Sequence, residues 1–389
     1  MQKHAPFSGP TGERIPLQKP VRAARETAYI EEVLAAGHLT GDGAYSKLCE
    51  KWLEENLGCK KAMLTPSCTA ALEMSALLLD IAPGDEVIMP SYTFVSTANA
   101  FVLRGAVPVF VDIRPNTLNL DEELIESAIT EKTRAIVPVH YAGSACNMDA
   151  IGAVAKRYGV AIVEDAAQAL LSSYHGQSLG TTGRFGCISF HATKNVTSGH
   201  GGAILINDEH DIERAEVIRD RGTNRRQFLK GDVQNYAWID VGSSYFLSEI
   251  CSGVLFAQLQ QAKWINHARL AVGRKYRDGL ASLETAGRIR LPLELEETHG
   301  NGHIFYLLTA DKLERDLLLT HLRGRGVEAA FHYTPLHTSP AGRRFGRAHG
   351  GLPNTERASD TIVRLPVFPT LRNEQTDAVI SAVQEFYWK

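Results

Sequence analysis

The chain has 389 residues, of which 44% are hydrophobic and 22% are charged, a balance typical of globular proteins. Its formal net charge is −3, and its 41 lysine and arginine residues are scattered, which argues against a nucleic-acid partner. No apolar run approaches the roughly 20 residues of a membrane-spanning helix, and residues 1–20 lack the apolar stretch of a signal peptide, so we expect a cytoplasmic protein with no membrane partner.

Short apolar runs between residues 61 and 206 predict a buried β-sheet. The runs are Lys61–Thr65, Glu86–Pro90, Val107–Asp112, Arg134–His140, Val160–Asp165, Cys187–His191 and Gly202–Ile206. Because the runs are continuous rather than alternating, we expect both faces of the sheet to be covered, as in parallel sheets. Helical stretches lie between several of them, at Ala70–Leu79, Glu122–Thr130 and Asp149–Tyr158. This alternation of strand and helix predicts an α/β layered domain.

The pattern changes after Asp208. Asp211–Arg219 is typical of a short helix, and Ser248–Leu283 is a long helical pattern that we expect Gly253 or Gly273 to kink or split. A single core stops growing at about 250–300 residues, so two domains are expected. We predict a large α/β domain over residues 1–255 and a smaller α+β domain over residues 256–389, bridged by the long helical segment.

Polar residues follow three of the predicted strands, where open α/β sheets bind their ligands. Asp165 ends the fifth run, and Ser189 and then Lys194 follow from the sixth. The first run leads through Thr65-Pro-Ser-Cys-Thr69 into a helix. Taken alone, each of these features is better explained as a solvated turn, a surface charge or a helix N-cap.

Together, these residues match the requirements of one cofactor. A helix N-terminus with the hydroxyls of Ser67 and Thr69 suits a phosphate, and Ser189 would add another hydroxyl. Asp165 would bind a protonated pyridine nitrogen, and Lys194 would form a Schiff base with an aldehyde. These are the contacts that pyridoxal 5'-phosphate (PLP) requires.

The sequence resembles the DegT/DnrJ/EryC1/StrS family of sugar-nucleotide aminotransferases, a branch of the fold-type I PLP-dependent enzymes. The resemblance covers nearly the whole chain, and its markers are TPSCTAAL at 65–72, PSYTFVSTAN at 90–99, VEDAAQ at 163–168, SFHATK at 189–194 and FHYTPLH at 331–337. It implies a mixed, mostly parallel seven-stranded sheet flanked by helices, followed by the smaller C-terminal domain. It also implies Lys194 as the lysine that carries the cofactor and Asp165 as the pyridinium partner.

Further roles follow from the resemblance. Gln168 would lie by the ring hydroxyl, Phe94 would stack on the ring, and the phosphate contacts would be Cys68, Thr69 and Ser189. Candidates for the sugar-nucleotide pocket are His332, Tyr333, Asn224 and Arg225. The five-residue spacing of His332 and His337 around Pro335 fits no helical metal pair, so no metal is expected.

The resemblance implies a homodimer whose active sites are shared between subunits. Two departures from the family pattern concern the phosphate. Cys68 stands where many relatives have glycine, and Phe246 stands where many have an asparagine that reaches the other subunit's phosphate. Ser243 and Ser244 are the alternatives for that second contact.

The activity implied is transamination of TDP-4-keto-6-deoxyglucose by L-glutamate, with pyridoxamine phosphate carrying the amino group between them. The resemblance favours the galactose configuration at position 4, which gives TDP-4-amino-4,6-dideoxygalactose and 2-oxoglutarate. The alternatives are the glucose configuration, amination at position 3 and a UDP-linked substrate. Lys194 argues against the related pyridoxamine-dependent dehydratases, which have histidine at this position. A non-catalytic nucleotide-sugar-binding regulator is the alternative from a different class.

Overall fold

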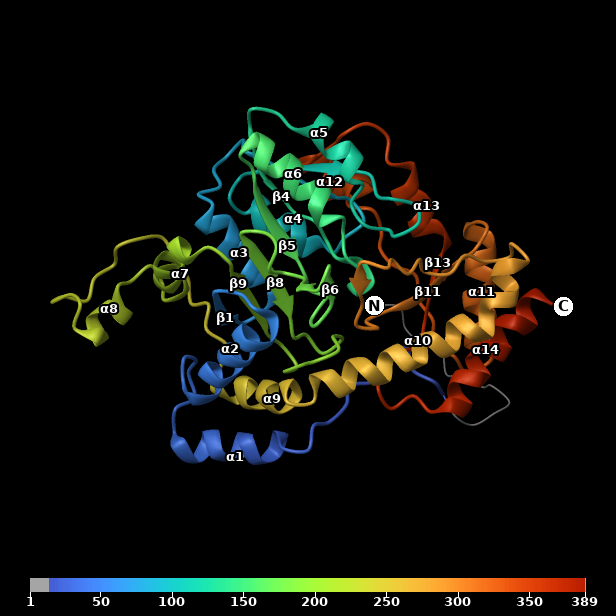
Figure 1. The fold of residues 1–389 in the computed structure, drawn as a ribbon, viewed down its shortest axis with the longest axis horizontal. Helices are drawn as coiled ribbons and strands as arrows, with labels where there is room; N and C mark the ends of the chain where they lie inside the picture. Colours follow the sequence, from blue (N-terminus) through green and yellow to red (C-terminus); the bar gives the residue numbers. More distant parts are fainter. Residues whose placement is uncertain (1–13, 389) are drawn as a thin grey trace.

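The computed structural model describes residues 14–388, so the predictions for residues 1–13 lie outside the described part of the chain. Every predicted strand run enters one sheet, in the order β1-β9-β8-β5-β4-β2-β3-β12 (Figure 1). The strands are β1 (Lys61–Thr65), β2 (Glu86–Pro90), β3 (Val107–Val111), β4 (Thr133–Ile136), β5 (Ala161–Asp165), β8 (Phe185–Ser189), β9 (Gly202–Ile206) and β12 (Arg347–Ala348). Strand β9 runs antiparallel to both of its neighbours, and the remaining pairs are parallel. The sheet is therefore mixed and mostly parallel, with one short strand, β12, beyond the seven predicted.

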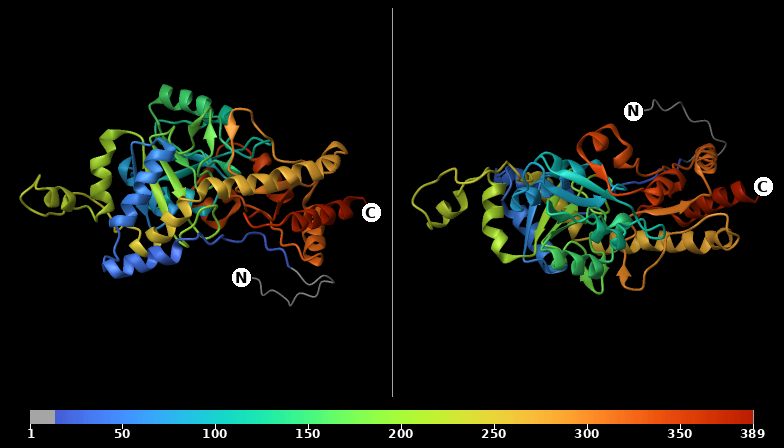
Figure 2. Two further views of the ribbon diagram at one scale, coloured as in Figure 1. Left: turned by 60° about the horizontal axis from the view of Figure 1, so that its bottom comes forward. Right: turned by 90° about the horizontal axis from the view of Figure 1, so that it is seen from above.

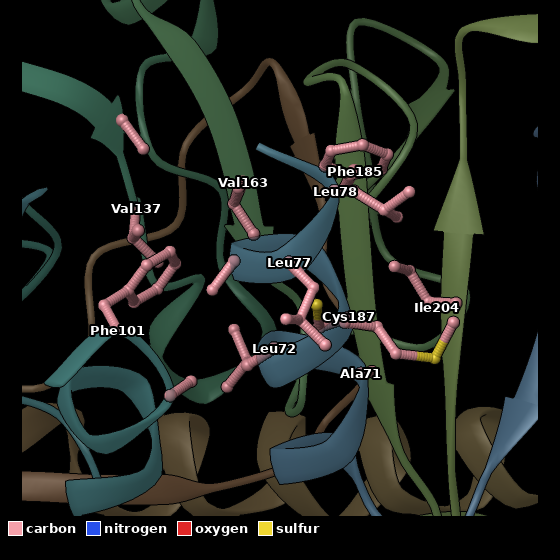
Figure 3. Close-up of a cluster of buried hydrophobic side chains, with 14 of the residues drawn as sticks. Ala71, Leu72, Leu77, Leu78, Phe101, Val137, Val163, Phe185, Cys187 and Ile204 are labelled. Carbon is pink, nitrogen blue, oxygen red and sulfur yellow. The ribbon is translucent and has the colours of Figure 1, made fainter. Parts of the chain in front are cut away.

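Helices cover both faces of this sheet because alternate residues of its strands point to opposite sides. On one face, α3 (Cys68–Leu78) packs its apolar side chains over the middle of the sheet (Figure 3). Beside it lie α4 (Val95–Val102) and α7 (Ile212–Arg219). The opposite face is covered by α2 (Ala44–Leu57), α5 (Ile125–Ala128), α6 (Met148–Tyr158) and α9 (Glu249–Leu259). This coverage explains why the strands carry continuous apolar runs.

A second cluster of buried side chains forms beyond the sheet. It is built from α10 (Ala262–Thr285), α11 (Lys312–Gly324), α14 (Asn373–Tyr387) and the antiparallel pair β11 (Phe305–Leu308) and β13 (Ile362–Leu365). Helix α10 runs from the large sheet to these C-terminal elements (Figure 1). Ile15 also packs in this cluster and pairs with Val327. The division at residues 255 and 256 stays a prediction.

The long helical segment breaks at a different place from the one predicted. Helix α9 ends at Leu259 and α10 begins at Ala262, so the break is at Gln260 and Gln261. Gly253 and Gly273 both lie inside regular helix. A Cβ on Gly253 would lie 3.4 Å from the backbone oxygen of Tyr29 in α1 (Glu26–Ala36), which is an ordinary van der Waals distance. Neither glycine interrupts its helix, so the predicted position of the break is wrong.

The remaining elements are short. They are β6 (Ser173–Tyr174), β7 (Gln177–Ser178) and β10 (Thr298–His299), which form a small sheet, with α8 (Arg225–Lys230), α12 (Pro340–Phe345) and α13 (Pro353–Thr361). The predicted helix at 122–130 is a 3₁₀ turn, Glu122–Leu124, followed by α5. Residues 222–241, which we call the arm, carry α8 and project from the body at the end opposite the C-terminal helices (Figures 1 and 2). Across residues 14–388, every helix is too short or too polar to span a bilayer.

Candidate active site

A cavity of about 570 Å³ opens at the carboxyl ends of β5 and β8, beside the N-terminus of α3. Its lining includes every predicted site residue except Asn224, Arg225 and the two alternatives Ser243 and Ser244: Ser67, Cys68, Thr69, Phe94, Asp165, Gln168, Ser189, Lys194, His332 and Tyr333. These side chains come from both ends of the sequence. The fold thus gathers into one hollow the strand-end residues that the sequence only suggested.

The first part of the cavity is the turn into α3. Ser67 is extended and caps the helix, because its hydroxyl accepts a hydrogen bond from Ala70 N at 3.1 Å. Thr69 Oγ1 donates to Ser96 Oγ at 2.7 Å, and both residues line the cavity. Ser189 lines the cavity from the end of β8. Free N–H groups of a helix N-terminus and nearby hydroxyls suit a phosphate.

The turn is packed closely against the sheet. A Cβ on Gly202, at the start of β9, would lie 2.4 Å from Cys68 N. The Cys68 side chain itself is buried, and burial, followed by the charge of Asp165, raises the pKa of its thiol well above the usual value. Cys68 is therefore held as a neutral thiol.

Asp165 is the last residue of β5, and its carboxylate is fixed on both sides. Thr97 Oγ1 donates to Oδ2 at 2.7 Å, and Ala167 N donates to Oδ1 at 3.1 Å. Its neighbour Glu164 points to the other face of the sheet, where it accepts hydrogen bonds from Gly180, Thr182 and Gly183 N–H groups. Alternation along the strand thus separates a structural carboxylate from the one in the cavity.

Lys194 lies in the turn after β8, where its backbone N–H donates to the backbone oxygen of His191 at 2.8 Å. Burial lowers the pKa of the Lys194 amine, although the nearby Cys68 and Asp165 act in the opposite direction. Arg364, which also lines the cavity, lowers that pKa further. The neutral amine, which is the form that can attack a carbonyl or accept a proton, is therefore easier to reach here than in water.

The remaining wall of the cavity is formed by aromatic and amide side chains. Gln168 Nε2 donates to the Tyr333 hydroxyl at 3.1 Å, while Gln168 Oε1 accepts from Ala142 N at 2.7 Å. His332 Nδ1 lies 3.1 Å from the Tyr141 hydroxyl, and burial lowers the pKa of His332. Phe94, at the start of α4, lines the cavity and is 56% exposed.

Four titratable residues of the lining were not predicted: His191, His200, His303 and Arg364. His303 Nδ1 contacts Asn195 Oδ1 at 2.9 Å, and the backbone oxygen of His303 accepts from Arg269 Nη2 at 2.7 Å. The position of His191 and His200 beside Lys194 in the sequence was a signal for them. His303 and Arg364 carry no such signal, because they come from strands and loops distant in the chain.

Asn224 and Arg225 lie in the arm, away from the cavity of their own chain. Asn224 braces the arm, since its Nδ2 donates to Asn235 O at 3.0 Å and its Oδ1 accepts from Ala237 N at 2.7 Å. Phe246 stacks under the guanidinium of Arg219 at 4.6 Å. Among residues 14–388, no group of three or more His, Cys, Asp or Glu side chains could hold a metal ion.

These residues fit PLP. One end of the cavity offers helix N–H groups and hydroxyls for a phosphate, the middle offers a fixed carboxylate for a ring nitrogen, and Lys194 offers an amine. The carboxylate suits this role because hydrogen bonds from Thr97 and Ala167 fix the orientation of both Asp165 oxygens.

A family model of the DegT/DnrJ/EryC1/StrS aminotransferases matches residues 20–384, and the chain belongs to this family. Solved structures of aminotransferases support this family assignment. The aminotransferase TlmJ from Streptoalloteichus hindustanus is 30% identical with a TM-score of 0.89, over 97% of this chain and 99% of that one. S. venezuelae DesV is 33% identical with a TM-score of 0.87, over 97% and 99%.

A third structure bears on the cofactor. Spr1654 of Streptococcus pneumoniae, described as a sugar aminotransferase, is 26% identical in its PLP form with a TM-score of 0.87, over 96% of this chain and 98% of that one. It is also known in a pyridoxamine phosphate form. The chain is thus an aminotransferase that uses PLP and pyridoxamine phosphate.

Gly202→Ala tests the phosphate end of the cavity. The new methyl group would overlap Cys68 N and displace the turn into α3, so we expect the Kd for PLP to rise by roughly 10-fold. Gly152→Ala in α6 is the control, because its Cβ would meet nothing within 4 Å. Equilibrium dialysis of PLP with the two variants makes the comparison, and equal affinities would refute the role of this turn.

Proposed function

We propose that the protein transfers the amino group of L-glutamate to TDP-4-keto-6-deoxyglucose, giving TDP-4-amino-4,6-dideoxygalactose and 2-oxoglutarate. The observation that carries the aminotransferase activity is the meeting of Lys194, Asp165 and the α3 N-terminus in one cavity. The substrate rests on the resemblance of the markers described above, such as SFHATK at 189–194, to those of TDP-4-amino-4,6-dideoxygalactose transaminases. Spr1654, described as a sugar aminotransferase, supports a sugar substrate.

Each residue has a separate task in this proposal. When bound, PLP supplies an electron sink that stabilises negative charge at the carbon bearing the amino group. Asp165 holds positive charge at the ring nitrogen. Lys194, released as a neutral amine, takes the proton from the donor carbon and returns one to the acceptor carbon. Gln168 and Phe94 orient the ring, and Ser67, Thr69, Cys68 and Ser189 hold its phosphate.

The arm supports a homodimer with shared active sites. Trp238 is 80% exposed and Leu229 is 67% exposed, and both lie on the arm beside exposed Phe228 and Ile239. Apolar side chains gathered on a projecting segment are typical of a surface that a partner covers. In this proposal the arm of one subunit brings Asn224 and Arg225 to the sugar-nucleotide pocket of the other. Sedimentation velocity of the holoenzyme checks the expected dimer.

The substrate is tested by supplying the PLP form with L-glutamate and a panel of keto sugar nucleotides. We expect turnover with TDP-4-keto-6-deoxyglucose, and NMR coupling constants of the product distinguish the galactose from the glucose configuration at position 4. A UDP-linked sugar or a 3-keto sugar as the better substrate would contradict the assigned substrate. Tight binding of sugar nucleotide without any turnover would favour the regulator alternative.

A further inference from the structure

We propose that His303 is a positioning residue for Lys194, on which it acts through Asn195, the next residue in the chain. This inference rests on the proposed function, because it concerns how Lys194 reaches the carbon from which it takes a proton. His303 lines the cavity, yet the cofactor and substrate contacts described above give it no task.

The hydrogen bonds of Asn195 determine which nitrogen of His303 carries a proton. Asn195 Nδ2 lies 3.0 Å from the backbone oxygen of Asn301, which can only accept, so Nδ2 is the amide donor. It also donates to Asn266 Oδ1 at 2.8 Å. The other amide atom of Asn195, Oδ1, is then the acceptor that lies 2.9 Å from His303 Nδ1. His303 therefore donates from Nδ1, the ring nitrogen nearer to its backbone.

The surroundings of His303 keep its ring neutral and in place. Burial lowers the pKa of His303 well below its usual value, and the charges of Lys194 and Arg269 act in the same direction. The backbone is held as well, since Arg269 donates from Nε to Gly302 O at 3.0 Å and from Nη2 to His303 O at 2.7 Å. A Cβ on Gly302 would lie 2.9 Å from the backbone carbonyl carbon of Arg269, so this segment is tightly packed.

The bond to His303 matters for Lys194 because the turn that carries the lysine has little other support. Residues 190–201 contain no helix or strand, so side-chain hydrogen bonds fix much of this turn. Asn195 is buried, and its partners come from α10 and from the segment before β11. The turn is therefore fastened to C-terminal elements at the residue next to Lys194.

The same segment also supports Gln168, the residue assigned to the ring hydroxyl of the cofactor. Asn301 Nδ2 donates to the backbone oxygen of Gln168 at 2.9 Å. Residues 301–303 thus hold the neighbour of Lys194 with one side chain and the backbone of Gln168 with another. We infer that this segment fixes the spacing between the lysine and the residue that orients the ring.

Proton transfer depends steeply on such spacing. Lys194 Nζ takes a proton from the α-carbon of the donor, and the C–H bond breaks readily only when the amine is aligned with it. A misplacement of about 1 Å reduces the rate of such a step by roughly 100-fold. Binding of glutamate uses other contacts, so a misplaced Lys194 is expected to slow the reaction and leave the affinity unchanged.

The test compares His303→Phe with His303→Asn. Phenylalanine fills the space of the ring but has no donor for Asn195, whereas asparagine is smaller and keeps an N–H donor at the position of Nδ1. His299→Phe is the control, because His299 is exposed on the same segment and lies outside the cavity lining. Asn195→Ala, alone and combined with His303→Phe, completes a double-mutant cycle.

Three quantities are measured on each variant. Stopped-flow absorption follows the loss of the visible band of the PLP form with L-glutamate and with glutamate deuterated at the α-carbon. The formation of the same band is followed when PLP is added to the apoprotein, which reports how well Lys194 is placed without any substrate. Calorimetry gives the melting temperature.

We expect His303→Phe to slow the reaction with saturating glutamate by roughly 10- to 100-fold, to increase the isotope effect and to slow band formation about 10-fold. The Kd for glutamate should stay within about twofold of the wild type, and His303→Asn should react within about threefold of the wild-type rate. His299→Phe should behave like the wild type. The double variant should be no slower than the slower single variant, because both substitutions remove the same link.

An unchanged rate and isotope effect in His303→Phe would overturn the inference. So would equal losses in His303→Phe and His303→Asn, which would show that the shape of the ring matters rather than its donor, and losses that multiply in the double variant. If His303→Phe does not fold, Asn195→Ala and His303→Asn carry the same comparison. A wild type that reacts with glutamate but with no keto sugar nucleotide would refute the proposed function and leave this inference standing.

Discussion

Lys194→Ala is expected to lower kcat/KM for transamination by roughly 10⁴-fold or more, with the fold retained. The variant loses both the group that attaches the cofactor and the group that moves the proton, and each contribution is large. The Lys194 amine is buried, and burial lowers its pKa, so its removal eliminates a costly buried charge. We therefore expect a melting temperature at or above that of the cofactor-free wild type, measured by calorimetry.

Lys194→Arg is the matched control for charge and size. Arginine stays protonated at any working pH, so this variant keeps the positive charge without a neutral amine. It should be as inactive as Lys194→Ala. Added methylamine should restore part of the activity of Lys194→Ala but none of that of Lys194→Arg, because only the alanine variant leaves space for a small free amine. Steady-state turnover by Lys194→Ala within tenfold of the wild type would contradict the assigned role.

Asp165→Asn is expected to reduce kcat/KM by roughly 10²- to 10³-fold, because a buried positive charge on the cofactor ring would lose its partner. The substitution suits the site. Asparagine Oδ1 still accepts from Ala167 N, and Thr97 Oγ1 can accept from the new amide while donating to Thr93 Oγ1, 2.8 Å away. Folding should therefore be preserved, as near-UV circular dichroism will report.

Thr97→Val separates orientation from charge at this carboxylate. It removes the hydroxyl that donates to Asp165 Oδ2 but leaves the carboxylate in place. We expect a loss of about 10-fold in kcat/KM, the effect of one hydrogen bond to a charged group. If Thr97→Val loses as much activity as Asp165→Asn, the orientation of the carboxylate matters rather than its charge. Near-wild-type activity of Asp165→Asn would exclude the role of Asp165 at the ring nitrogen.

The sheet was accessible from the sequence because each buried strand is a continuous apolar run, such as Val160-Ala-Ile-Val163 before Glu164 and Asp165. Strand β12 was not predictable from the sequence, because Arg347 and Ala348 have no apolar pattern. They join the sheet only through tertiary contacts with β3. The break between α9 and α10 was misplaced because an isolated glycine such as Gly253 is tolerated inside a packed helix.

The cavity residues could also be predicted only in part from the sequence. Asp165, Ser189 and Lys194 were found because each ends or follows a strand and belongs to a recognisable motif. Arg364 stands inside an apolar run, Ile362–Leu365, where a single charge suggests only a solvent-facing position. Its place in the cavity lining depends on how the C-terminal elements pack against the large sheet, and short-range patterns do not encode that packing.

The most direct test of the account is the visible absorption spectrum of the protein purified with PLP, recorded before and after L-glutamate is added. We predict a visible band that depends on Lys194 and that fades with glutamate as the pyridoxamine phosphate form appears at shorter wavelength, with an equivalent of 2-oxoglutarate released. A protein that stays colourless with excess PLP, or whose band does not respond to any amino acid, would contradict the central claim.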